Sequence, residues 1–258
     1  MDNRDFERLG AISAAAVGVL SLLYAVAYLV ITPSDQRGSD LDKFVRSYLA
    51  HPAGLRMAAV CLLLSGLLSG AAIVAVIGRI GAAAKRSLTW AGIVAVIAGL
   101  ATSAHGLSDL VGVDKLAHRY AAGDAATRAA VAVVHATPSQ VDPRGLATFA
   151  ASGLVAFVVG LGLRGLRPRL GLLGVVLGAD MVLLFVANAV GVNSLVLLTG
   201  GLASVVLGPI WWLSLARLLR AAGAPSPASP ASPASPASPS PASPASPAPA
   251  PTTSRAPA

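Results

Sequence analysis

The chain has 258 residues, of which 55% are hydrophobic and 12% charged, and its mean hydropathy is +0.73. A soluble domain carries about 25% charged residues, so this composition excludes a soluble globular protein. The net charge of +8 does not indicate nucleic-acid binding. Lys and Arg gather at the ends of apolar segments, where they orient a membrane chain and contact anionic lipid head groups. We therefore expect membrane lipids, and no nucleic acid, as partners.

Six apolar segments follow one another along the chain, and each approaches the ~20 residues that a helix needs to cross a bilayer. The predicted spans are 9–31, 55–77, 88–111, 146–163, 170–190 and 195–216. The predicted fold class is therefore all-α, a polytopic membrane bundle of six transmembrane helices at residues 1–222. The leader before the first span has mixed charge, and the apolar stretch exceeds the ~7–15 residues of a signal core. We expect this span to stay in the protein.

Two of the loops that follow these spans are predicted to carry short amphipathic helices. Residues 40–49 can place their apolar side chains on one face, and residues 112–144 predict one or two such helices with a break at Gly123. We expect these helices to lie on the membrane surface or to cap the bundle. A lid over a ligand is the alternative.

The positions of the basic residues predict how the bundle is oriented. The short loops after the second and fourth spans are crowded with Arg79, Lys85, Arg86, Arg164, Arg167 and Arg169. The loops after the first and third spans are longer, and their basic residues are balanced by acids. Because short basic loops stay in the cytoplasm, we expect a cell inner-membrane protein with cytoplasmic N- and C-termini.

The second and sixth spans carry residues that predict local helix geometry. Gly66 and Gly70 form a small-xxx-small pattern, which lets a neighbouring helix approach closely and marks internal packing more often than a homodimer. Pro209 lies inside the sixth span and removes one helix hydrogen bond, so we expect a kink there.

The third span carries a polar pair. His105 and Asp109 are four residues apart and share one helix face near the outer end of the span. An Asp can orient a His by accepting its ring proton, as it does beside metal and proton-relay sites. The simpler interpretation is hydrogen bonding at the membrane interface. All four histidines, the other three being His51, His118 and His135, are predicted on the outer side, but no pair has the close spacing of metal ligands.

The fifth span contains the acid that lies nearest the middle of any span. Asp180 costs ~2.5–3.5 kcal/mol on membrane-insertion scales, so we expect it to face protein or water. Gly171, Gly174 and Gly178 lie roughly opposite it, and the span is therefore predicted to be central in the bundle. Asp180 is either a proton or cation site, with Asn188 extending a polar stripe, or a structural acid bonded to a neighbouring polar side chain.

The composition changes at residues 223–258, which consist mostly of Ser, Pro and Ala and hold twelve of the eighteen prolines. Such a segment forms neither helix nor sheet, and we expect a disordered, polyproline-II-like cytoplasmic tail. Docking of a partner is the alternative to a segment of drifting low complexity.

Three stretches carry a resemblance: Asp-Pro-Arg-Gly-Leu-Ala at 142–147, Arg-Pro-Arg-Leu-Gly-Leu-Leu-Gly at 167–174 and Gly-Pro-Ile-Trp-Trp at 208–212. Together they resemble a family of uncharacterised bacterial multi-pass membrane proteins, a domain of unknown function. The similarity spans residues 116–220. The resemblance implies a bacterial inner-membrane helical protein and implies no activity.

Motifs of enzymes are absent from the chain, which has no phosphate-binding Gly loop with Lys, no HExxH, no CxxC and no GxSxG. The leading hypothesis is a non-enzymatic integral membrane protein that acts through interaction or sensing, with a protein partner or a second copy of the chain, and without a cofactor. One alternative is a small proton- or cation-coupled transporter centred on Asp180. A further alternative is a haem or metal redox protein that uses the outer-side histidines.

Overall fold

The computed structural model describes residues 3–38, 40–80, 85–137 and 141–223. Within these residues helices account for 92% and no strand occurs. The predicted tail at 223–258 lies, apart from its first residue, outside the described residues. The helices are α1 (Asn3–Val26), α2 (Leu41–Ala50), α3 (Ala53–Ile80), α4 (Lys85–Ala122), α5 (Ala125–Ala136), α6 (Ser152–Leu163), α7 (Pro168–Val190), α8 (Asn193–Gly201) and α9 (Gly208–Gly223).

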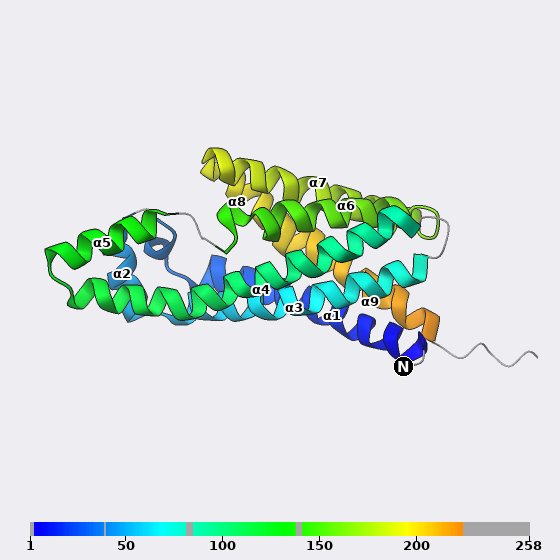
Figure 1. The fold of residues 1–258 in the computed structure, drawn as a ribbon, viewed down its shortest axis with the longest axis horizontal. Coiled ribbons are helices and arrows are strands. Elements are labelled where there is room, and N and C mark those ends of the chain that lie inside the picture. Colours follow the sequence, from blue (N-terminus) through cyan, green and yellow to red (C-terminus); the bar gives the residue numbers. More distant parts are fainter. Residues whose placement is uncertain (1–2, 39, 81–84, 138–140, 224–258) are drawn as a thin grey trace, which may run out of the picture. The chain divides into compact units, whose positions relative to one another are not determined.

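Six helical segments of the described chain are long and apolar enough to cross a membrane, which confirms the predicted all-α bundle. They are Asp5–Ile31, Ala53–Ile80, Leu88–Ala122, Pro143–Leu163, Pro168–Val190 and Asn193–Ala221. Because their number is even, the last helix ends on the side where the first helix begins, and the C-terminal end of α9 lies near the N-terminus of α1 (Figure 1).

Three of the spans contain a wider π-helical turn. Ala27–Ile31 continues α1, Leu146–Ala151 precedes α6, and Leu202–Leu207 joins α8 to α9. The last of these turns comes just before Pro209, which has no N–H to donate to the preceding turn. The irregularity expected at Pro209 therefore takes the form of a π turn, a feature that is frequent at functional sites.

The bundle is built from close helix pairs: α1 with α3 and α9, α3 with α4, and α6 with α7. Its core is mainly apolar and contains the fully buried Val76, Val159, Trp211, Leu215 and Leu219. The apolar windows of α4 and α3 are 44% and 39% buried, against 33% for α7. The prediction that span five is central is therefore wrong, because α7 lies to one side and packs mainly on α6.

Helix α4 continues well beyond its predicted end at residue 111. Its 38 residues have a length of ~57 Å at 1.5 Å per residue, longer than a bilayer with its head groups at ~40–45 Å. The helix stops where Gly123 and the capping residue Asp124 follow it.

The predicted amphipathic helices pack at this far end of α4, where α2 and α5 lie away from the N-terminus (Figure 1). Phe44, Val45 and Tyr48 of α2 are buried against Ala117 of α4. The ring of Phe44 also lies 5.2 Å from that of His135 on α5. These short helices therefore have a core of their own beside the main bundle.

Candidate functional site

A half-open cavity of about 350 Å³ lies between the helices of the bundle, and all six spans contribute to its wall. We call it the apolar cavity, because its large side chains are Val17, Ile73, Leu177, Leu184 and Trp211 among others. Hydroxyl groups of Ser residues also line it. They donate to carbonyls of their own helices, as Ser21 does to Val17 at 2.8 Å and Ser69 to Gly66 at 2.9 Å. These two O–H donors are thus used within the protein, and the wall presents mainly apolar surface.

A second cavity of about 430 Å³ adjoins the first, and we call it the polar cavity. Its ionisable lining side chains are Tyr24, Tyr28, Tyr48, Arg56, His105, Asp109, His135, Asp142 and Arg144. Volumes of both cavities fall in the range of ~300–1,000 Å³ that small-molecule sites occupy. The two cavities share five lining residues, which we call the neck: Tyr24, Tyr28, Leu62, Thr148 and Phe149.

Three of the five neck residues lie in π turns at the ends of two spans, and the other two, Tyr24 and Leu62, belong to α1 and α3. Tyr28 belongs to the π turn that ends the first span, and its ring stacks on that of Tyr24 with centroids 6.0 Å apart. Thr148 belongs to the π turn that begins the fourth span, and its Oγ1 lies 3.0 Å from Oγ1 of Thr102 on α4. A π turn shifts the register of side chains around the helix axis, and so it places these groups between the two cavities.

His105 and Asp109 lie together in the wall of the polar cavity. Nε2 of His105 is 3.4 Å from Oδ2 of Asp109, as their spacing along α4 predicts. The His105 side chain is 25% exposed, and its Nδ1 is buried with no hydrogen-bond partner among the described residues. An unsatisfied buried polar atom costs about 1–3 kcal/mol, so this ring retains an unused site for a hydrogen bond.

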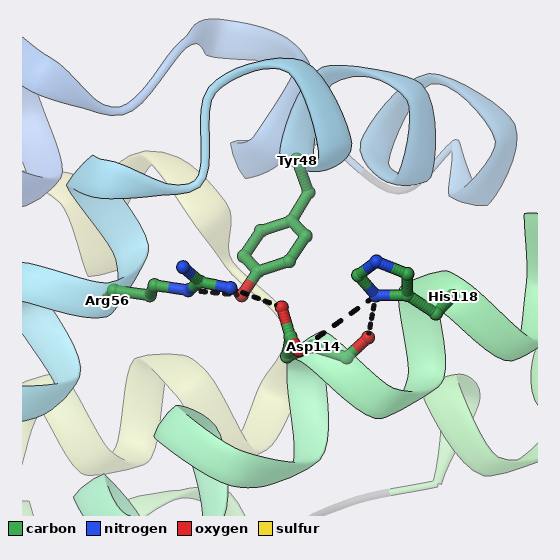
Figure 2. Close-up of polar contacts among 4 residues, drawn as sticks. All are labelled: Tyr48, Arg56, Asp114 and His118. Atoms are coloured by element: carbon green, nitrogen blue, oxygen red, sulfur yellow. Dashed lines mark hydrogen bonds and ion pairs between the residues drawn. The ribbon is translucent and has the colours of Figure 1, made fainter.

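A polar cluster lies beside the polar cavity, whose wall includes Tyr48 and Arg56, and Figure 2 shows the four residues of the cluster. Arg56 at the start of α3 donates to Asp114 of α4 and, at 3.4 Å, to the hydroxyl of Tyr48 on α2. His118, one turn further along α4, lies with its Nδ1 2.9 Å from the carbonyl oxygen of Asp114. The cluster ties three helices together, and the sequence alone did not indicate it because the partners are 58 residues apart.

The turn before the fourth span forms another part of the wall. Asp142 is 1% exposed, and it accepts hydrogen bonds from the backbone N–H groups of Ala147 at 2.7 Å and Thr148 at 3.1 Å. It therefore caps the first turn of the span and holds Thr148 in the neck. An Asp followed by Pro before an apolar segment is a known helix-start signal, and it would have identified this residue from the sequence.

Arg144 in the same turn has a φ of 55°, a left-handed conformation that costs of the order of 1–3 kcal/mol for a residue with a side chain. Arg144 also exchanges hydrogen bonds with the C-terminal end of α7. Asn188 donates to the Arg144 carbonyl at 2.8 Å, while the guanidinium donates to the carbonyls of Asn188 and Ala189. The structure thus places Asn188 at the polar cavity and gives it a bonding role there.

Asp180 lies apart from both cavities. Its side chain is half-buried, and Oδ2 has no hydrogen-bond partner among the described residues. Neither cavity wall, as far as the structure describes it, includes this residue. The polar stripe expected to join it to Asn188 therefore does not line a shared cavity.

The glycines singled out in the sequence lie at contacts between helices of this chain. A Cβ added to Gly66 would lie 2.5 Å from the Gly99 carbonyl oxygen on α4, and one added to Gly70 would lie 3.3 Å from Cα of Val96. On α7, Gly171 and Gly178 face the backbone of α6, and Gly174 faces both α6 and Nε1 of Trp211. These stripes let pairs of helices approach until their backbones touch.

Metal ligands do not gather in the described part of the chain: no group of three or more His, Cys, Asp or Glu side chains is present there. His105 and His135 line the polar cavity, whereas His51 ends α2 and His118 belongs to the polar cluster. The haem or metal alternative has no assembled ligand set among these residues.

Comparisons of the chain with protein-family models, with curated proteins and with solved structures find no match. The resemblance to uncharacterised bacterial membrane proteins therefore stays a prediction.

Proposed function

We propose that this protein is a non-enzymatic inner-membrane protein, with both termini in the cytoplasm, that binds and senses a small amphipathic molecule taken from the bilayer. The observation that carries the proposal is the pair of adjoining cavities, one apolar and one polar, which share the five neck residues. An apolar wall matches the body of such a molecule, and a few polar groups at one end fix its orientation.

The position of the apolar cavity supports sensing. Side chains from all six spans line it, so a bound molecule contacts every span at once. A ligand shifts a conformational equilibrium by the difference in its affinity for the two states. A molecule that fills this cavity therefore favours the helix arrangement in which the cavity has its full volume.

The test uses a long-chain alcohol that carries a photoreactive diazirine in its chain and a terminal alkyne. Irradiation of the protein in lipid nanodiscs is expected to label peptides of the cavity wall, such as residues 17–29 and 146–156. Gly201→Leu should suppress this labelling at least fivefold, because Gly201 lines the cavity and an added Cβ there meets no atom within 4 Å.

The matched control is Gly112→Leu. Gly112 also has open space around an added Cβ, but it lies on α4 outside both cavity walls. Its labelling should equal that of the unsubstituted protein. Equal labelling of the two Leu variants, or labelling confined to lipid-facing peptides, would contradict the proposal.

A second proposal, a proton- or cation-coupled transporter, is favoured by one observation. Asp180 has a buried, unpartnered carboxylate oxygen within a span, and intramembrane acids often mark ion pathways. In a Cys61→Ala background, Asp180→Cys should react with a water-soluble maleimide from one side of the membrane. Absence of labelling from either side would rule this function out.

A further inference from the structure

Resting on the proposed function, we infer that the ligand is an amphipathic cation, and that its ammonium end binds the Asp109 carboxylate in the polar cavity while its apolar part lies along the neck. Three properties of the polar cavity carry the inference. One acid of its wall is accessible and has no fixed cation beside it, the arginines of the wall already have partners, and two aromatic rings line the same space.

Asp109 is the accessible acid of the polar cavity. As far as the structure describes the wall, it contains two acids, Asp109 and Asp142. Asp142 is 1% exposed and accepts the backbone N–H groups of Ala147 and Thr148, whereas the Asp109 side chain is 48% exposed. Of the two carboxylates, a ligand in the cavity can therefore reach that of Asp109.

The Asp109 carboxylate has no fixed cation beside it. Within the described part of the chain its partner is Nε2 of His105 at 3.4 Å, and no Lys or Arg there pairs with it. An imidazole is a cation only when it is protonated. Asp109 also lies well inside α4, so neither end of that helix offsets its charge. A carboxylate accepts several hydrogen bonds, and an ammonium group supplies both the donors and a positive charge.

The arginines of the same wall do not make it a site for an anion. Arg56 pairs with the Asp114 carboxylate, which offsets its charge. Arg144 donates to the carbonyls that end α7, and the C-terminal end of a helix carries a partial negative charge. An anionic ligand would have to displace one of these partners, whereas a cation at Asp109 displaces none of them.

Two tyrosine rings line the space through which the body of the cation would pass. Tyr24 and Tyr28 stack with centroids 6.0 Å apart and an interplanar angle of 2°, and both belong to the walls of the two cavities. Aromatic faces attract cations and also supply a large apolar surface. An ammonium end at Asp109 therefore leaves the apolar part of the ligand beside the neck, next to the apolar cavity.

The experiment measures competition against the photoreactive alcohol in nanodiscs of zwitterionic phosphatidylcholine, because anionic lipid would attract a cation by itself. Dodecylammonium, dodecanol and dodecanoate share one chain length and differ in charge, since at about pH 8 an amine is protonated and a carboxylic acid is ionised. We expect dodecylammonium to compete at a mole fraction in the bilayer about tenfold lower than dodecanol, the effect of one charge-assisted hydrogen bond. Dodecanoate should compete no better than dodecanol.

Substitutions locate the ammonium group. Asp109→Asn keeps the shape of the side chain and removes its charge, so it should raise the half-competing mole fraction of dodecylammonium about tenfold and change that of dodecanol by less than about twofold. Asp109→Glu keeps the carboxylate and should retain most of the preference. Asp124→Asn is the matched control, because it removes one carboxylate of the chain from outside both cavity walls and keeps the helix cap. Its preference should be unchanged, and thermal unfolding should show all three variants folded.

The outcomes separate the two proposals. The cationic assignment is wrong if dodecanol or dodecanoate competes best, or if Asp109→Asn leaves the preference for dodecylammonium unchanged, while Gly201→Leu still suppresses labelling. An equal loss of preference in Asp109→Asn and Asp124→Asn overturns the role of Asp109, because it would reflect the net charge of the protein. Labelling that is insensitive to Gly201→Leu overturns the proposed function itself.

Discussion

Gly66 and Gly70 of α3 form one sequence pattern but meet different surroundings. A Cβ at Gly66 would lie 2.4 Å from Oγ of Ser103 and 2.5 Å from the Gly99 carbonyl oxygen, whereas at Gly70 the nearest atom is Cα of Val96 at 3.3 Å. Gly66→Ala must therefore separate α3 from α4, and we expect it to lower the free energy of unfolding by about 1–3 kcal/mol. Gly70→Ala should cost less than half as much.

Unfolding in mixed detergent micelles measures this difference. Gly112→Ala serves as the control, because an added Cβ there meets nothing within 4 Å. Its midpoint should equal or exceed that of the unsubstituted protein, since Ala favours helix over Gly. Equal losses at Gly66 and Gly70 would show that the pattern, and not the local contact, determines stability.

Residues whose interactions are local were predictable. The distance between His105 and Asp109 follows from helix geometry, because residues four apart lie on one face. The surroundings of Asp180 depend on how other helices pack around α7. The spacing of residues along α7 alone could not predict whether Asp180 lines a cavity. Asp142 lies between these cases: its capping bonds are local, but its contribution to the neck arises only when α1 and α4 pack beside it.

At the scale of elements, the start of α5 depends on one carboxylate. The backbone N–H of Thr127 donates to Asp124 at 2.8 Å, and this bond lowers the pKa of Asp124. A lowered pKa in the folded state means that the cap stabilises α5 above the ordinary Asp value of about 3.9 and loses this effect as the pH falls through the lower folded value.

We therefore predict that the amide resonance of Thr127 titrates with a midpoint below that of an unfolded Asp. Asp124→Asn should remove the titration and keep the helix, because Asn caps as well as Asp. Asp124→Ala should increase amide hydrogen exchange in the first turn of α5 at every pH. A midpoint at or above the ordinary Asp value would contradict the assigned cap.

Element types were predicted better than element lengths. The break at Gly123 appears where expected, since Gly and a capping Asp end one helix and start the next. The end of α4 was predicted eleven residues too early, because the apolar run stops at residue 111 while the helix continues to Ala122. Packing of Ala117 against α2 stabilises this extension. The hydropathy of the sequence cannot predict a contact between two separate helices.

At the scale of the whole molecule, the proposed orientation predicts which side each end faces. In a Cys61→Ala background, Asp5→Cys and Ala221→Cys should resist a membrane-impermeant maleimide in intact cells and react after permeabilisation. Asp40→Cys should react in intact cells, because Asp40 is exposed in the loop before α2. If the two terminal positions react in intact cells, both termini face outward and the proposed orientation is wrong.

The sequence by itself determined that this chain forms a membrane bundle of six helices, because span length and hydropathy are properties of contiguous residues. Local spacing also determined the pair His105 and Asp109. Only the tertiary structure decided that all six spans line an apolar cavity, that this cavity shares wall residues with a polar one, and that Asp180 lines neither. A cavity is the space left between side chains of different helices, so its place depends on packing between residues that are far apart in the chain.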